Sequence, residues 1–324
     1  MSISIIIPTY NRSKALITTL NAYKKQSVPC YCFEVIIIDD GSDIKVADCI
    51  KKRSYNFKIH IIRQKHSGPA AARNLGFKKA KKQIILFTGD DMVPERDFLK
   101  HHIETHKTHK KKTIAVLGKI IWPPKKKITP FMRYVTEIGG QQFSYFKIKK
   151  KYLNDYNFFY SSNISLKRDY LKKTKELFNT AFLKPAFEDI ELGYRLVKKH
   201  ALCIVYDDRA IAYHNHKINL PDFYKRNFDV GYALMFFCSL HPGVMQARIE
   251  GFTGLYLDYS SAMPKTLLKQ YNQLKKKEIT AKTLRSKEKI QKKMHDLFSY
   301  ALVLALLSGM TYFLRIKKVR QCCI

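Results

Sequence analysis

The sequence predicts an α/β fold with a mostly parallel central sheet flanked by helices. Through residues 1–120, short apolar segments rich in β-branched residues alternate with segments of helical periodicity. Strands joined by helices form parallel sheets with right-handed crossovers. Polar segments also follow the first, second and fourth expected strands, and ligands bind beyond the carboxyl ends of such strands. With 324 residues, 46% of them hydrophobic, the chain can form one large domain or a domain with an extension.

Local signals define the elements of this region. Pro8 closes the first strand, Asn11 or Ser13 caps the first helix, and Ser67-Gly68-Pro69 opens a later one. The helix after the second strand has the weakest periodicity. In chain order, the expected elements are strand 2–7, helix 13–26, strand 33–38, helix 44–53, strand 58–63, helix 69–80, strand 83–87, helix 97–109 and strand 113–120.

The pattern becomes irregular at residues 122–160, where Pro123-Pro124 and Gly139-Gly140 mark loops. Regular elements then resume. A helix at residues 187–196 begins with acidic residues in its first turn, where the helix dipole favours them. The remaining expected elements are strand 161–166, late strands at 202–206 and 210–213 followed by His214-Asn215-His216, and helix 220–240.

Two adjacent carboxylates, Asp90 and Asp91, follow the fourth strand and Gly89. Strand interiors disfavour Asp, and two neighbouring anions repel each other. A positive group is therefore expected at this strand end. Mg²⁺ and Mn²⁺ bind carboxylate oxygens together with substrate phosphates. The pair therefore indicates a divalent metal site.

The chain is strongly basic, with 60 Lys and Arg against 26 Asp and Glu, a net charge of +34. This excess favours a polyanionic partner: a nucleic acid, an anionic membrane surface or a phosphorylated substrate. A nucleic acid is not expected, because no basic-aromatic recognition motif is present. The seven Cys residues include no C-x-x-C pair, which argues against zinc and disulfide frameworks and favours a reducing cytosol. Met1-Ser2 leads directly into a strand, so no signal peptide is expected.

The C-terminal segment differs in composition from the rest of the chain. Residues 265–293 carry 11 Lys or Arg and two acids, and residues 297–314 contain no charged residue. As a helix, these 18 residues span about 27 Å, barely the thickness of a bilayer core. Because both flanks are basic, an anchor lying in the plane of an anionic membrane is favoured over a spanning helix. A buried core helix is the alternative.

Five motifs occur in a fixed order: SIIIPTYNR at 4–12, VIIIDDGS at 35–42, GPAAARNLG at 68–76, TGDD at 88–91 and FEDIELGYRL at 187–196. Together they closely resemble the nucleotide-sugar glycosyltransferases of family 2, which have the GT-A fold. The resemblance covers residues 1–240, so we expect a catalytic domain there and a basic helical tail at residues 241–324. Any one motif alone is a weak signal, and the five together are a strong one.

The resemblance implies roles for individual residues. Pro8, Thr9 and Tyr10 would line the pocket of the nucleotide base, Asp40 would accept a hydrogen bond from the base, typically uracil, and Arg73 would lie over the base or ribose.

For the reacting groups, the resemblance implies that Asp90 lies on the ribose or metal side and that Asp91 binds Mn²⁺ or Mg²⁺ directly. Asp189 would be the catalytic base. His214 would lie near the metal and diphosphate, with His216 as the alternative. Gly89 occupies the first position of the family's Asp-x-Asp pattern, so the metal prediction rests on Asp91.

Further sugar contacts are expected from Trp122, Asn163 and Glu188. Each predicted site residue also has an ordinary structural interpretation. The Asp39-Asp40-Gly41 segment is also typical of a turn, and Glu188-Asp189 of a helix N-terminus. In the same way, Arg73 is compatible with a helix surface, His214 with a core histidine, Trp122 with packing and Asn163 with a turn.

The sequence therefore predicts an inverting, metal-dependent glycosyltransferase. It would use a nucleoside-diphosphate sugar, with a UDP-sugar favoured, and a glycan or lipid-linked acceptor in polysaccharide or cell-envelope synthesis. The expected location is cytoplasmic and peripheral, on the inner face of the cell membrane. The alternative is a non-catalytic module on the same fold that binds nucleotides or polyanions.

Overall fold

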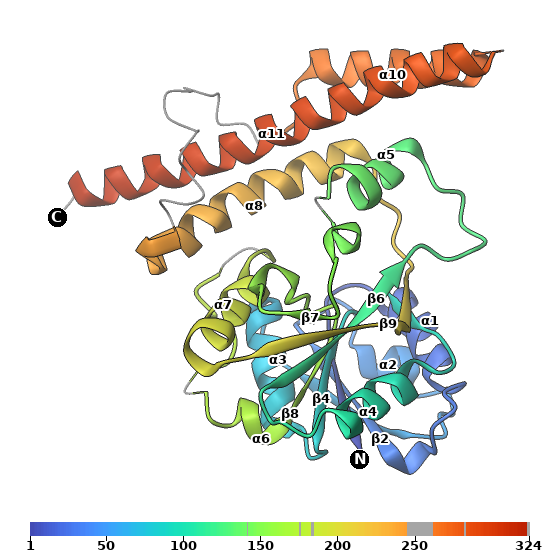
Figure 1. Ribbon diagram of the computed structural model, residues 1–324, viewed down its shortest axis with the longest axis vertical. Coiled ribbons are helices and arrows are strands. Elements are labelled where there is room, and N and C mark those ends of the chain that lie inside the picture. Colours follow the sequence, from blue (N-terminus) through green and yellow to red (C-terminus); the bar gives the residue numbers. More distant parts are fainter. Residues whose placement is uncertain (141, 175, 183–184, 245–261, 282, 323–324) are drawn as a thin grey trace. The chain divides into compact units, whose positions relative to one another are not determined.

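The computed structural model describes residues 1–140, 142–174, 176–182, 185–244, 262–281 and 283–322, with side chains as far as Ile316. The chain divides into two compact units. The sheet unit comprises residues 1–126 and 145–216, and the helical unit comprises residues 127–144 and 217–324 (Figure 1).

The described residues of the sheet unit contain a nine-stranded sheet in the order β3-β2-β1-β4-β8-β6-β9-β5, with β7 pairing with β9. β1 pairs in parallel with β2 and β4, and β2 with β3, as the βαβ pattern predicts. β8 is antiparallel to both of its neighbours. The strands are β1 Ile3–Thr9, β2 Phe33–Asp39, β3 Lys58–Arg63, β4 Ile84–Thr88, β5 Met92–Pro94, β6 Ile114–Ile121, β7 Tyr152–Leu153, β8 Asn163–Lys167 and β9 Cys203–His214.

Helices cover the sheet, so its central strands are apolar on both faces. Ile5, Ile6 and Ile36 are fully buried. α3 packs closely on β1 because Gly76 has no side chain: a Cβ there would lie 2.4 Å from Ile6 Cγ2. The helices of this unit are α1 Ser13–Tyr23, α2 Val46–Ile50, α3 Gly68–Lys79, α4 Phe98–Thr108, α6 Arg168–Leu171 and α7 Glu188–His200.

Three differences from the sequence prediction concern strands. Residues 203–214 form one strand, β9, rather than two. A register shift at Gly118 and Lys119 of β6 accommodates the extra residues of β9, so the polar residues near Asp208 form a bulge rather than a turn. The short strands β5 and β7 are too brief to give a periodic signal, and they are defined by their pairing with β9.

The helical unit contains α5 Pro130–Arg133, α8 Leu220–Leu240, α10 Lys265–Thr280 and α11 Leu284–Cys322. α8 and α11 run side by side (Figure 1) and approach closely at two glycines. A Cβ on Gly231 would lie 2.0 Å from Leu306 O, and one on Gly309 would lie 1.9 Å from Phe228 O. Asn227 Nδ2 also donates to Leu302 O at 2.7 Å. The expected boundary near residue 240 stays a prediction, although α8 itself packs within the helical unit.

A buried polar network lies between α4 and β8. His102 lies 2.9 Å from both Ser165 Oγ and Asn163 Oδ1, and His106 Nε2 lies 2.9 Å from Ser165 Oγ. Burial lowers the pKa of His102 to about 4 and that of His106 to about 3. Both imidazoles are therefore neutral in the folded protein at neutral pH.

We predict that acid destabilises the protein through these two histidines. The unfolded chain protonates them near pH 6.5, whereas the folded chain resists protonation until about pH 4. Because the unfolded state binds more protons in this window, the free energy of unfolding falls as the pH drops through it. Urea unfolding at about pH 7 and about pH 5 measures the loss.

His106→Gln keeps a donor for Ser165 and removes one titrating group, so its stability should fall less on acidification. His200→Gln, at an exposed position, is the control and should behave as wild type. If wild type, His106→Gln and His200→Gln lost the same free energy of unfolding on acidification, His106 would not be a source of the acid sensitivity.

Candidate active site

Residues from separate segments meet at the carboxyl ends of β1, β2 and β4. Thr9 pairs with Asp39 in the β1–β2 register, and Asp40 N donates to Thr9 O at 2.9 Å. Thr9 Oγ1 donates to Asp90 Oδ2 at 2.8 Å. The predicted convergence on one sheet edge is therefore present in the fold, as parallel strands require.

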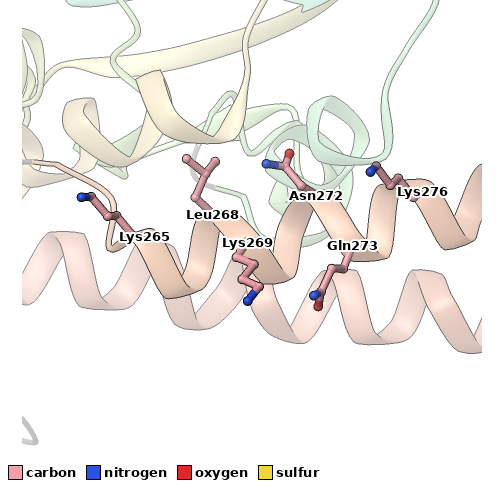
Figure 2. Close-up of a pocket in the computed structure, with 6 residues that line it drawn as sticks. All are labelled: Lys265, Leu268, Lys269, Asn272, Gln273 and Lys276. Atoms are coloured by element: carbon pink, nitrogen blue, oxygen red, sulfur yellow. The ribbon is translucent and has the colours of Figure 1, made fainter.

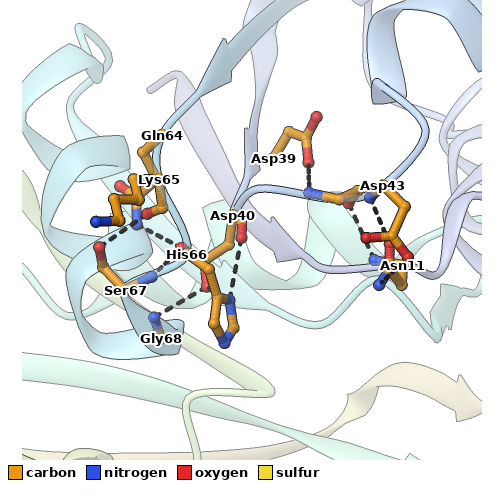
Figure 3. Close-up of polar contacts among 10 residues, drawn as sticks. Asn11, Asp39, Asp40, Asp43, Gln64, Lys65, His66, Ser67 and Gly68 are labelled. Atoms are coloured by element: carbon orange, nitrogen blue, oxygen red, sulfur yellow. Dashed lines mark hydrogen bonds and ion pairs between the residues drawn. The ribbon is translucent and has the colours of Figure 1, made fainter.

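Asp40 holds the loop that leads into α3 (Figure 3). Its Oδ1 accepts from Gln64 Nε2 at 2.6 Å and from Ser67 N at 2.9 Å, and its Oδ2 accepts from Gly68 N at 2.9 Å. His66 Nδ1 lies 2.9 Å from the same Oδ2. The carboxylate is buried, and both of its oxygens accept hydrogen bonds from the loop. Asp40 therefore stabilises the conformation of this loop. A hydrogen bond to a base stays a prediction.

Tyr10 and His66 form a stacked pair beside this loop, with ring centroids 4.1 Å apart and planes 25° apart. Tyr10 is 41% exposed, so part of its side chain is open to solvent. Asn11, with φ 54°, exchanges hydrogen bonds with Asp43 and fixes the β1–α1 loop against the β2–α2 loop. Sequence reasoning missed His66, although it stands two residues before the GPAAARNLG motif.

Arg12 lies against the predicted metal-binding pair. Its guanidinium forms ion pairs with Asp90 Oδ1 at 3.1 Å and with Asp91 Oδ2 at 2.6 Å. Burial raises the pKa of Asp90 to about 7, although Arg12 opposes this. Burial acts in the same direction on Asp91, but His214 and Arg12 together outweigh it and hold the pKa of Asp91 well below its usual range. Sequence reasoning missed Arg12, the last residue of the SIIIPTYNR motif.

The pairing of β5 with β9 brings His214 to the acids. Met92 is paired with His214, and Asn215 N donates to Asp91 O at 2.8 Å. His214 Nε2 therefore lies 3.4 Å from Asp91 Oδ2.

Trp122 stacks on His214 with ring centroids 5.2 Å apart, and the Lys126 ammonium lies over Trp122 and donates to His216 O. Trp122 thus packs on a predicted metal-binding residue. Its contact with a sugar stays a prediction.

A carboxylate oxygen and an imidazole nitrogen are donors that suit Mn²⁺ or Mg²⁺. Over the described residues, no cluster of three or more His, Cys, Asp and Glu side chains is arranged to hold a metal. Asp91 and His214 supply two donors, and Mg²⁺ sites commonly complete their shell with substrate phosphates and water. The residues present therefore fit a metal that binds together with a diphosphate.

A second acidic group lies at the start of α7. Asp189 Oδ2 accepts from both the backbone N and the Oγ of Ser161 at 3.1 Å, and its Oδ1 accepts from Ile190 N. Phe187, just before the helix, has φ 66°. A non-glycine residue in this strained region is typical of functional sites.

Arg73 contacts Glu188 rather than the nucleotide-side loop. Arg73 NH1 lies 2.9 Å from Glu188 Oε1, and its guanidinium lies 5.4 Å from the Phe178 ring centroid. Both side chains are buried, and Arg73 Nε and Glu188 Oε2 have no hydrogen-bond partner. Burial raises the pKa of Glu188. A contact between Arg73 and the base or ribose stays a prediction.

Asn163 corrects one sequence prediction. It is fully buried in the sheet, with Oδ1 near His102 and with Nδ2 donating to Lys119 O and Ala210 O. Because its amide is engaged inside the protein, Asn163 is not placed to contact a sugar.

A comparison with protein-family models finds that the glycosyl transferase family 2 model matches residues 4–175. Among curated relatives, a dolichyl N-acetyl-alpha-D-glucosaminyl phosphate 3-beta-D-2,3-diacetamido-2,3-dideoxy-beta-D-glucuronosyltransferase of Methanococcus voltae is 31% identical over 61% of this chain and 62% of its own length. Chondroitin synthase of Pasteurella multocida is 27% identical over 66% of this chain and 25% of its own length. The chain thus spans less than two thirds of these relatives.

Solved structures share the fold. The S. aureus TarS 1–349 structure has a TM-score of 0.54 at 18% identity and covers 98% of this chain and 92% of its own. The mannosyltransferase PcManGT from Pyrobaculum calidifontis, in complex with GDP-Man and Mn²⁺, has a TM-score of 0.58 at 14% identity and covers 96% and 86%. The predicted GT-A fold is confirmed.

We predict that Asp40→Asn loosens the loop at residues 64–68. An amide cannot accept on both sides, so one NH₂ donor would face the donors of Ser67 or Gly68. The expected loss of stability is about 2 kcal/mol, with faster hydrogen exchange at those two backbone amides. Asp43→Asn, which changes an exposed carboxylate in the same region, should leave these amides protected. Unchanged exchange in Asp40→Asn would refute this role.

Proposed function

The chain belongs to glycosyl transferase family 2, and we propose that it transfers a sugar from a nucleoside-diphosphate donor to a glycan or lipid-linked acceptor in polysaccharide or cell-envelope synthesis. The observation that supports this most is the meeting of Thr9, Asp90, Asp91 and His214 at one end of the sheet. These residues come from three distant segments of the chain and form an anionic, partly imidazole-lined site.

The proposed donor is a UDP-sugar. The TarS structures include complexes with UDP and UDP-GlcNAc, and PcManGT was solved with GDP-Man. In this chain, Pro8, Thr9 and Tyr10 would line the base pocket, and the exposed Tyr10–His66 pair offers an aromatic surface for stacking. Asp40 would keep the loop beside the pocket in place. Arg73, which lies on α3, would contact the base or the ribose.

Asp91 and His214 would hold a divalent cation against the diphosphate of the donor, with Asp90 in support. A bound Mn²⁺ or Mg²⁺ supplies Lewis-acid stabilisation of the charge that develops on the leaving group. Before the metal and donor bind, Arg12 holds the carboxylates of Asp90 and Asp91 in place through two ion pairs. Trp122 would keep the His214 ring in place by stacking on it.

Asp189 is the proposed catalytic base. The acceptor hydroxyl oxygen forms a bond to the anomeric carbon as the bond from that carbon to the diphosphate oxygen breaks. The hydroxyl proton passes to Asp189, and the departing nucleoside diphosphate keeps the electron pair. One displacement inverts the anomeric configuration. Ser161 orients the carboxylate through two hydrogen bonds. Glu188, next to Asp189, would contact a sugar of the donor or acceptor.

An anionic membrane surface is the proposed partner of the helical unit, with the protein peripheral on the cytoplasmic face. The segment 284–316 of α11 is long and apolar enough to cross a bilayer by length and composition, with a mean hydropathy of 1.8 and half of its apolar window buried. Phe298, Ala301 and Ala305 are buried, whereas Tyr300 and Val303 are 60% and 44% exposed. One face of α11 thus packs inside the unit, and the other is left apolar and exposed.

Basic residues lie next to Tyr300 and elsewhere on α10. Lys277 of α10 and Lys293 of α11 line a surface hollow together with Tyr300. Figure 2 shows three further lysines of α10, Lys265, Lys269 and Lys276, around a second hollow of about 440 Å³. Arg315 follows the apolar stretch, and Lys317, Lys318 and Arg320 lie outside the described side chains. An apolar face with basic neighbours supports an in-plane anchor on anionic lipid rather than a spanning helix.

The alternative function is a non-catalytic module that binds nucleotides or polyanions. We predict that Asp189→Asn separates the two functions. The amide cannot take the acceptor proton, so the transfer rate with a UDP-sugar and Mn²⁺ should fall about 10²–10⁴-fold, while UDP affinity stays within about twofold. Asp169→Asn, an exposed acid in the first turn of α6, is the matched control. No turnover by wild type with any common donor would support the alternative.

We also predict that Val303→Glu weakens binding to anionic vesicles at least about tenfold, because it places a charge on the face that enters the interface. Ile44→Glu makes the same change at an exposed apolar residue of the sheet unit and should bind as wild type. Vesicle co-sedimentation measures both, with circular dichroism to confirm folding. Equal binding of the two variants would reject α11 as the anchor.

A further inference from the structure

Arg12 bridges the two aspartates of the acidic site. Its NH1 pairs with Asp90 and its NH2 with Asp91, and NH2 also lies 3.2 Å from His216 Nδ1. The Arg12 side chain is 38% exposed, whereas the two aspartate side chains are 5% and 8% exposed. One guanidinium therefore connects the buried acid pair to the histidine segment that follows β9.

The acid pair requires a cation at this position. Two adjacent carboxylates in a buried site repel each other and lose hydration, so each is stabilised by a shared positive charge. The planar guanidinium suits this task because it presents several donors in a fixed fork. Arg12 thus supplies, from within the chain, the charge that the sequence pattern assigns to a metal.

Arg12 and a divalent cation cannot use Asp91 Oδ2 together. NH2 of Arg12 lies 2.6 Å from this oxygen, on the side shared with His216. Two positive charges within about 4 Å repel strongly in a site of low effective dielectric. A metal held by Asp91 Oδ2 and His214 would therefore displace the guanidinium from Asp91.

We propose that Arg12 is a built-in counter-ion that competes with the metal for Asp91 and moves to the donor diphosphate when metal and nucleotide bind together. This inference rests on the proposed function. Its consequence is that the metal and the nucleotide bind cooperatively: the metal alone removes the contact of Arg12 with Asp91 and leaves it only Asp90, whereas the metal with a diphosphate provides a second anion for Arg12.

The local structure allows this movement in the side chain alone. The backbone before Arg12 is fixed, because Asn11 N donates to Ser42 Oγ and the Asn11 side chain pairs with Asp43. The backbone after it is fixed by α1, which begins at Ser13. The long Arg12 side chain is partly exposed and can leave the acids without a change in fold.

The test is isothermal titration of Mn²⁺ into the full chain, with and without saturating UDP. In wild type, UDP should raise Mn²⁺ affinity at least about tenfold. In Arg12→Gln, Mn²⁺ alone should bind at least about tenfold more tightly than it binds wild type, and the enhancement by UDP should shrink by a similar factor. Mn²⁺ should also raise the melting temperature of Arg12→Gln more than that of wild type.

Two further variants define the effect. Arg63→Gln removes an arginine of similar exposure, 39%, that pairs with Asp39 at 2.8 Å, and should bind Mn²⁺ as wild type does. Arg12→Lys keeps the charge but loses the fork, so its Mn²⁺ affinity should lie between those of wild type and Arg12→Gln. Arg12→Lys also decides the question if Arg12→Gln does not fold.

Equal or weaker Mn²⁺ binding by the Arg12 variants would overturn the inference and leave the proposed function standing. Tighter binding by Arg63→Gln as well would also overturn it, because the effect would then be a general consequence of lost positive charge. Absence of Mn²⁺ binding in every variant, with or without UDP, would instead overturn the metal part of the proposed function.

Discussion

The structure depends on a pair of adjacent carboxylates buried at the end of a central strand. β4 is buried throughout, and the two aspartates follow it at the edge of the sheet where β1 also ends. Polar groups from separate segments contact these carboxylates: Thr9 and Arg12 from the β1–α1 segment, and His214 from β9. Thr19 Oγ1 also donates to the backbone oxygen of Asp90. Elements from both ends of the sheet unit are thus held by one electrostatic requirement.

Sequence periodicity was sufficient for the parallel half of the sheet, because each of its strands is a short apolar run that ends in a polar turn. It also located the acid pair, since two aspartates after a buried strand are conspicuous without any knowledge of the fold. It failed for β9, where Asp207 and Asp208 resemble a turn. The bulge opposite Gly118 keeps these residues in the strand, and a bulge is defined by the partner strand rather than by local sequence.

The site residues that sequence reasoning missed share the same cause. Arg12 and Asp91 are 79 positions apart, and His66 stands 56 positions after Tyr10. Neither contact leaves a periodic trace, because both arise from the order of strands in the sheet. Asn163 was misassigned for the converse reason: its polarity indicated a site, but His102 and the carbonyls of Lys119 and Ala210 satisfy it inside the core. The burial of one face of α11 also depends on contacts between distant segments, because Gly231 of α8 and Gly309 of α11 let the two helices approach closely.

The two acidic groups of the sheet unit have the same electrostatic design. Arg12 neutralises Asp90 and Asp91, and Arg73 neutralises Glu188 next to Asp189. In each case, a buried carboxylate pairs with an arginine from a distant segment of the chain. In the second pair, the buried atoms Glu188 Oε2 and Arg73 Nε have no hydrogen-bond partner. A buried ion pair is costly to leave half-satisfied, so such atoms favour a polar ligand that completes them. Under the proposed function, the diphosphate of the donor would lie at the Arg12 pair and a sugar hydroxyl near Glu188, so that one bound molecule would contact both clusters.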